Sequence, residues 1–158
     1  MRRMTIGALS LSAAGLIAIA SYEGFSDQAY IPVEGDVPTI GFGSTEGVEM
    51  GDTITVPEAL ERLRRDVGDA ESAIGRCVKV PLSQGEYDAF ASLAFNIGSN
   101  AFCTSTLVKR LNAGDYDGAC EEIRRWVYAG GQKLEGLVNR REAEYQMCME
   151  GKDVLRPR

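Results

Sequence analysis

The sequence contains no histidine, and this absence excludes several kinds of chemistry. Serine and cysteine hydrolase triads use histidine as their base, and most catalytic metal sites use it as a ligand, so carboxylates must carry any acid–base catalysis. Basic residues are also in deficit: 17 Lys and Arg face 23 Asp and Glu, which gives a formal net charge of −6. We therefore expect no metal, no cofactor and no nucleic-acid partner.

The N-terminal stretch "MTIGALSLSAAGLIAIAS", residues 4–21, lacks charge and follows Arg2 and Arg3. Its length is at the lower limit of a membrane span, and most of its residues are Gly, Ala, Ser or Thr. The two arginines would remain cytoplasmic and direct the rest of the chain outward. We favour an uncleaved export segment that inserts weakly and can later leave the bilayer. The alternative is a signal peptide cleaved after the "AIA" motif that ends at Ala20.

The four cysteines lack the CxxC spacing of a zinc site, and no histidine is present to join them as a ligand. An even number of cysteines in an exported chain predicts two disulfides. The alternative is four buried free thiols. The residues are Cys77, Cys103, Cys120 and Cys148, and the sequence leaves all three possible pairings open.

The rest of the chain predicts an α+β fold that is predominantly helical. With 158 residues, it is long enough for one domain with a sizeable core. Turn residues and strand formers over residues 25–45 predict a small hairpin. Capping boxes that begin at Thr55 and Ser83 start two helices. Expected helices are 55–74, 83–97, 104–112, 115–128 and 137–150.

Acidic residues occur just before the expected hairpin and within it. The apolar stretch runs helically into Glu23, and Gly24 is a natural helix stop. Low dielectric and the negative end of a helix both favour the protonated carboxyl that a general acid needs. A second acid, Asp36 or Glu34, would face it across a water near Thr39. That is the layout of an inverting glycoside hydrolase.

Four stretches occur in order along the chain: "SYEGFSDQAYIPVEGDVPTIGFGST", "SLAFNIGSNAF", "RRWVYAGGQ" and "GLVNRREAE". Together they resemble the phage lysozymes of the T4 type, glycoside hydrolase family 24, between residues 22 and 150. The resemblance implies a lysozyme-like fold with a small N-terminal β-hairpin lobe, a larger helical lobe and a cleft between them. It also implies a phage endolysin, a muramidase that cuts the β-1,4 bond between N-acetylmuramic acid and N-acetylglucosamine in peptidoglycan.

The catalytic triad of this family joins a glutamate, an aspartate or cysteine, and a threonine. Glu23 matches the glutamate of the "EG" motif, and Thr39 matches the threonine of the "TIGFG" motif. The middle member does not match. Counting forward from Glu23 leads to Pro32, and counting back from Thr39 leads to Val33. The hairpin therefore carries an inserted residue and a displaced acid.

Asp36 and Glu34 are the candidates for this displaced acid. We choose Asp36, which would hold the attacking water together with Thr39, whereas Glu34 lies at the expected tip of the hairpin. In an extended strand the odd spacing would put Asp36 and Thr39 on opposite faces. Gly35 and Pro38 favour a bulge or turn that changes this facing.

Other residues are assigned through the same resemblance. Asn96, in "FNIG", aligns with a cleft amide that would bind an N-acetyl group; the alternative is a helix-end cap. Arg140, in "NRRE", aligns with the arginine that pairs with the catalytic glutamate; the alternative is a surface pair with Glu144. Ser44, after the "GFG" turn, would be a turn former. Trp126, the single tryptophan, is expected in the core.

The apolar N-terminus resembles that of the signal-anchor-release endolysins. This subclass implies export, an inactive stage at the periplasmic face of the host inner membrane, and release into the periplasm on depolarisation. Residues 1–21 would form the anchor and then the N-terminal helix, and residues 22–158 the lysozyme domain of a monomer. Two other functions remain open: a lytic transglycosylase, which needs no activated water, and a non-catalytic wall-binding module tethered to the membrane.

Overall fold

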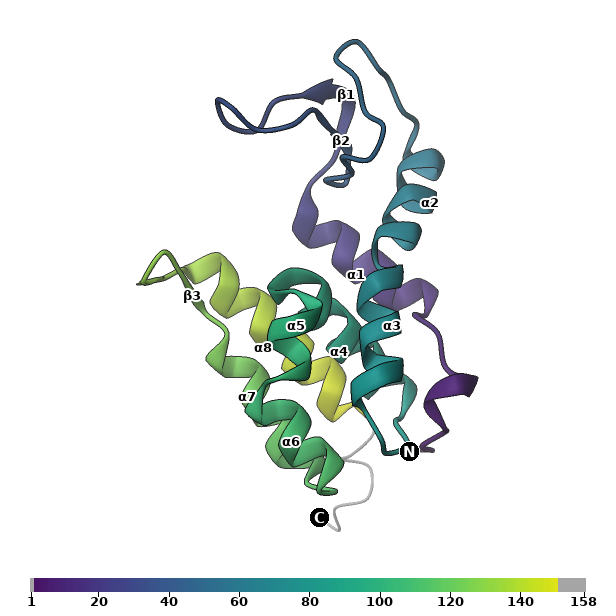
Figure 1. Ribbon diagram of the computed structural model, residues 1–158, viewed down its shortest axis with the longest axis vertical. Helices are drawn as coiled ribbons and strands as arrows, with labels where there is room; N and C mark the ends of the chain where they lie inside the picture. The colour runs from purple at the N-terminus through teal and green to yellow at the C-terminus, as the bar shows by residue number, and fades with distance from the viewer. Residues whose placement is uncertain (1, 151–158) are drawn as a thin grey trace. The chain divides into compact units, whose positions relative to one another are not determined.

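The computed structural model describes residues 2–150 of the chain. They divide into two compact units. The hairpin unit is Ala13–Gly68, and the helical unit joins the residues up to Ser12 with those from Asp69 onward. The predicted fold class is confirmed, since the chain is mostly helical and carries a small antiparallel hairpin near its N-terminus (Figure 1).

The hairpin unit is built from two helices and two short strands. These are α1 (Ala13–Glu23), β1 (Ser26–Tyr30), β2 (Thr39–Gly41) and α2 (Val56–Asp66). The strands pair antiparallel, with an irregular register between Ser26 and Tyr30 that places two extra residues on β1. Helix α1 packs against α2. A small apolar cluster of Ala29, Ile40 and Val48 lies beneath the hairpin.

The helical unit contains the larger core. Its elements are α3 (Gly68–Cys77), α4 (Gln84–Ile97), α5 (Ser99–Cys103), α6 (Thr106–Asn112), α7 (Tyr116–Glu122), η2 (Ile123–Arg125), β3 (Tyr128–Ala129), β4 (Gln132–Lys133) and α8 (Glu135–Met149). Phe90, Phe102 and Leu111 are fully buried in its centre. Helices α4 and α8 pack closely, because a Cβ at Gly85 would lie 2.6 Å from the Met147 carbonyl oxygen.

Both predicted capping boxes are present. At Thr55 and at Ser83 the side-chain oxygen accepts from the backbone N–H three residues on, and the glutamate there reaches back to the cap. The helix expected over 55–74 is, however, two helices, because α2 ends at Asp66 and α3 begins at Gly68. Buried apolar residues recur at helical spacing in both helices. The sequence pattern therefore gives no sign of the break between them.

Two other expectations on helices were wrong in length or number. The helix expected over 115–128 stops at Glu122 and continues only as the 3-10 turn η2, although Asp115 caps its start as predicted. Helix α5 was not expected, because its five residues are too short for an apolar period to show. The positive φ of +84° at Gly114 ends the preceding helical segment.

The apolar stretch 4–21 does not form one continuous helix. It contains the 3-10 turn η1 (Ile6–Ala8) and then α1, which begins only at Ala13. Within residues 2–150, none of the helices has both the length and the apolar character that a membrane span requires.

Residues 3–12 lie along the helical unit as a strap, a name we keep for this segment. Met4 pairs with Leu82 through two backbone hydrogen bonds of 2.7 and 2.9 Å. Arg3 donates to the buried carboxylate of Glu86 at 2.9 Å and lies over the Tyr116 ring. The rest of the strap is held by acids as well, because the N–H of Leu11 donates to Glu71 and that of Ser12 donates to Asp88.

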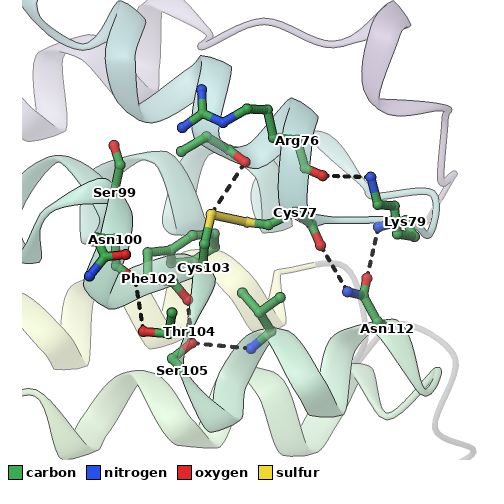
Figure 2. The surroundings of a disulfide bond; sticks show 12 residues. Arg76, Cys77, Lys79, Ser99, Asn100, Phe102, Cys103, Thr104, Ser105 and Asn112 are labelled. Carbon is green, nitrogen blue, oxygen red and sulfur yellow. Dashed lines mark hydrogen bonds between the residues drawn. A yellow bond between two sulfur atoms is a disulfide. The ribbon is translucent and has the colours of Figure 1, made fainter.

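Both expected disulfides are present, and both lie in the helical unit. Cys77 pairs with Cys103, and Cys120 pairs with Cys148. Figure 2 shows the first pair joining the end of α3 to α5, with Asn112 beside it. The Asn112 amide donates to the Cys77 carbonyl at 2.8 Å and accepts from the N–H of Lys79 at 2.7 Å. The chain after Cys77 is therefore held at two points.

The two disulfides are expected to stabilise the folded chain by similar amounts. Their sequence separations are 26 and 28 residues. Loop-closure entropy then predicts a loss of about 3–4 kcal/mol in the free energy of unfolding when either pair is replaced. Denaturant unfolding of the paired variants Cys77→Ala with Cys103→Ala, and Cys120→Ala with Cys148→Ala, measures this. A loss below about 1 kcal/mol for either pair would contradict the loop-closure explanation.

Candidate active site

Glu23 is the last residue of α1, as the sequence predicted. Gly24, with φ of +71°, turns the chain out of the helix toward β1. The half-buried Glu23 side chain points to the "GFG" turn, because a Cβ at Gly43 would lie 3.8 Å from its Oε2 atom. The structure thus brings together the "EG" and "GFG" motifs, which are separated along the chain.

The "GFG" turn is held firmly against α2. At Gly41 the φ of +64° favours glycine, and a Cβ there would lie 2.9 Å from the Ala59 Cβ. Ile40 and Ser44 exchange two backbone hydrogen bonds of 2.9 and 3.0 Å across the turn. The buried Ser44 hydroxyl donates to Asp66 on α2 at 2.6 Å. Ser44 is therefore an anchor of this turn as well as part of it.

Thr39 and Asp36 are linked through a single main-chain residue. The Thr39 hydroxyl donates to the Val37 carbonyl at 3.1 Å, and the Val37 N–H donates to Asp36 Oδ1 at 2.9 Å. Thr39 is buried, whereas Asp36 is exposed. Because the hydroxyl proton is engaged by Val37, the Thr39 oxygen is left as an acceptor.

Asp36 does not belong to a strand, so the odd spacing to Thr39 does not decide which way it faces. Strand β2 begins at Thr39. The Asp36 N–H donates to the Val33 carbonyl at 3.0 Å, which closes a tight turn around Glu34 and Gly35. Glu34 is exposed at this turn, as expected. The turn predicted at Gly35 is therefore present, and the irregular strand pairing is a separate feature of β1.

Arg140 lies in the helical unit and is buried with Glu144. Its Nε atom donates to Glu144 Oε1 at 3.2 Å, and the Glu144 side chain is fully buried. The i,i+4 pair considered in the sequence analysis therefore exists, although it is a buried pair and not a surface pair. Glu144 also accepts from the Ser92 hydroxyl at 2.6 Å and from Arg141 at 2.8 Å.

Asn96 is exposed in the last turn of α4. Its Oδ1 atom accepts a hydrogen bond from Arg141. The alternative role, a cap on the end of its own helix, is therefore not the contact that this oxygen makes. Arg141 and Glu144 were not singled out from the sequence as a pair. The signal was present in "RREAE", because residues three apart on a helix are neighbours.

Trp126 was expected in the core, and this expectation was wrong. It is half-buried and lines a cavity of about 260 Å³ together with Ser105, Glu122 and Arg125. The reason is local: η2 ends at Arg125, so Trp126 lies outside the helical stripe that faces the core.

A large cavity of the hairpin unit lies away from the predicted site residues. Its volume is about 540 Å³, and its lining includes Ile40, Pro57, Arg62 and Arg65. Ile40 follows Thr39 in β2, and neighbouring strand residues point to opposite faces. This cavity is therefore on the face of the strand opposite to Thr39, and we do not assign the chemistry to it.

Comparison with known proteins identifies the class. The profile of the phage lysozyme family matches residues 20–144. An endolysin of Acyrthosiphon pisum secondary endosymbiont phage 1 is 44% identical over 140 residues, covering 86% of this chain and 95% of the relative. The SAR-endolysin of Enterobacteria phage P21 is 34% identical over 148 residues, covering 92% of this chain and 90% of the relative.

A solved structure agrees with these relatives. A P22 lysozyme variant superposes with a TM-score of 0.82 at 35% identity, covering 90% of this chain and 99% of that one. The fold and the family together define a lysozyme-type glycoside hydrolase. The chain belongs to the phage lysozyme family.

Proposed function

We propose that this chain is a phage endolysin that hydrolyses the β-1,4 bond between N-acetylmuramic acid and N-acetylglucosamine in the host peptidoglycan. The observation that carries the proposal is the position of Glu23, at the end of α1 and beside the glycine turn that follows Thr39. Membership of the phage lysozyme family and the similarity to known endolysins support it.

In this proposal the two acids have different roles. Glu23 is the general acid that protonates the leaving oxygen of the glycosidic bond. Asp36 and Thr39 hold the attacking water, and the carboxylate stabilises the positive charge that develops on the sugar ring. Thr39 suits the role of acceptor because its own proton is donated to the Val37 carbonyl. Asn96 and Arg140 are the proposed substrate-binding residues of the helical unit.

A hydrolase is favoured over a lytic transglycosylase by the acceptor oxygen of Thr39. A transglycosylase forms an anhydro ring within the sugar and needs no activated water. Analysis of murein fragments for reducing or anhydromuramic ends separates the two enzymes. A wall-binding module without activity would release neither product.

Glu23→Gln is expected to abolish wall lysis without unfolding the chain, because the amide keeps the shape but cannot donate the proton. General acid catalysis contributes about 10²–10⁴-fold, so residual activity should fall below about one part in a hundred. The measurement is the release of reducing ends from purified murein, with circular dichroism as the control for folding. Activity above this level would remove Glu23 from the mechanism.

Asp36→Asn is expected to cost much more activity than Glu34→Gln. The two acids stand at the same exposed turn, so they form a matched pair of variants. The asparagine keeps an oxygen for the Val37 N–H, and the turn should persist. We expect a loss of about 10²-fold or more for Asp36→Asn and less than about threefold for Glu34→Gln. The reverse order would assign the second acid to Glu34.

We also propose that residues 4–21 first hold the chain at the host inner membrane and are later released uncleaved, so that the enzyme acts in the periplasm. The similarity to the SAR-endolysin of phage P21 supports this. Contacts of the strap support retention of the segment, because cleavage after Ala20 would remove Arg3 from the buried Glu86 and Ser12 from Asp88. Burying a carboxylate without its partner is costly. Cleavage would also remove Ile19 from the core.

Leucine at Gly7, Ala13 and Ala14 together is expected to trap the chain in the membrane. These three positions are exposed, so the substitutions should leave the folded form intact. Each leucine favours the span by about 0.3–0.6 kcal/mol at its centre. Cells that express this variant should survive a depolarisation that lyses cells with the wild-type chain, and membrane fractionation should retain it.

Serine at the same three positions is the matched control and should still be released. N-terminal sequencing of the soluble periplasmic chain tests the rival account. A chain that begins at Met1 agrees with release, and one that begins at Ser21 would show a cleaved signal peptide.

A further inference from the structure

A buried arginine lies directly behind the exposed amide at the end of α4. Arg141 is 1% exposed, and its Nη2 atom donates to the Oδ1 atom of Asn96. The two side chains come from different helices, α8 and α4, which pack against each other. The contact therefore joins the core of the helical unit to an exposed polar group on its surface.

The guanidinium of Arg141 is held on its other sides as well. Its Nε atom donates to the Trp126 carbonyl at 2.8 Å, and its Nη1 atom donates to Glu144 Oε2 at 2.8 Å. Glu144 is itself held by Ser92 at 2.6 Å and by Arg140 at 3.2 Å. With these contacts on a planar group, Arg141 has little freedom to turn.

This arrangement determines which way the Asn96 amide faces. A guanidinium has five N–H donors and no acceptor, so only the oxygen of the amide can point toward it. The NH₂ group must then point away from Arg141. Asn96 is exposed, and its Nδ2 atom has no hydrogen-bond partner among residues 2–150. The side chain therefore presents two N–H donors to solvent in one fixed orientation.

We propose that Arg141 is a positioning residue, which fixes the Asn96 amide so that its NH₂ group donates to a carbonyl oxygen of the glycan. This inference rests on the proposed function, because murein sugars carry acetamido groups with such an oxygen. A carboxylate of the peptide stem offers the same acceptor chemistry. Glu144 acts one step further back, since it neutralises and orients Arg141.

Asn96→Asp tests the direction of the amide without removing the contact behind it. A carboxylate keeps an oxygen for Arg141 and strengthens that bond, because both partners are then charged. Its outward atom becomes an acceptor that repels a carbonyl oxygen. We expect KM for murein fragments to rise about tenfold, with kcat within a factor of three and the thermal midpoint unchanged or raised. An unchanged KM would overturn the proposal.

Arg141→Lys tests whether the arginine acts through Asn96. Lysine keeps the charge but lacks the planar fork that reaches three partners at once. We expect a three- to tenfold rise in KM for the single variant, about the value of one hydrogen bond, and no further rise when it is added to Asn96→Ala. Equal effects in both backgrounds would mean that Arg141 has only a structural role. The matched control is Arg124→Lys, because Arg124 is an exposed arginine that pairs with Glu142. This variant should leave KM unchanged.

Binding to the Glu23→Gln chain distinguishes the two sources of the carbonyl oxygen, because this variant leaves the fragments intact. If the acetamido group is the ligand, Asn96→Asp in this background weakens binding of N-acetylated murein fragments. It does not weaken binding of de-N-acetylated ones, because their free amines are cationic and a carboxylate does not repel them. If a stem carboxylate is the ligand, Asn96→Asp weakens binding of both kinds of fragment. If binding of neither kind of fragment is weakened, the proposal is overturned. A wild-type chain that releases no reducing ends would instead refute the proposed function, and the binding comparison would still test the amide.

Discussion

The contact between the backbone of Gly41 and Ala59 on α2 is the constraint on which the rest of the hairpin unit depends. It leaves no room for a side chain at position 41. This contact and the hydrogen bond from Ser44 to Asp66 hold the glycine turn against α2 at two points. Because α1 packs against the same helix, the end of α1 and the turn share one support. Glu23 and the residues after Thr39 are therefore brought together on the same support, helix α2.

The helical unit uses buried charge for a comparable purpose. Glu144 is fully buried, yet it accepts hydrogen bonds from two arginines and a serine. Such a group contributes little net stability, because desolvation of the ions offsets most of their attraction. Its effect is geometric, since each donor is fixed in direction by the others. One carboxylate therefore sets the orientation of Arg141, and through it that of the Asn96 amide.

In the proposed function, the strap has to suit two environments, the membrane and the surface of the helical unit. After Arg3 the strap has no charged side chain, so it could form part of a weakly inserting membrane segment. The same stretch meets a row of acids on the helical unit, and these accept from its N–H groups and from Arg3. An apolar helix of leucines would have entered a bilayer more readily, but it would have offered fewer free N–H groups to those acids. The low apolar content is thus compatible with both states.

The sequence by itself determined the features that depend on neighbours along the chain. Capping boxes at Thr55 and Ser83, the helix end at Glu23, the hairpin and the presence of two disulfides could all be predicted, because each follows from a few adjacent residues or from the cysteine count. The family motifs added the class of enzyme. For the second acid, the sequence analysis chose Asp36 over Glu34 from the expected position of each in the hairpin, because the insertion removes the spacing that would identify it directly.

Only the tertiary structure decided what depends on contacts between distant segments. The break between α2 and α3 was hidden, because both helices continue the same apolar spacing. Which cysteines pair, where the strap lies, and why Trp126 is half-buried all require the packed chain. The same holds for the facing of the Asn96 amide: nothing near residue 96 indicates it, and it follows from a guanidinium that α8 supplies. Local propensity acts over one or two turns, whereas the direction of a polar side chain is set by whichever donor or acceptor the fold brings to it.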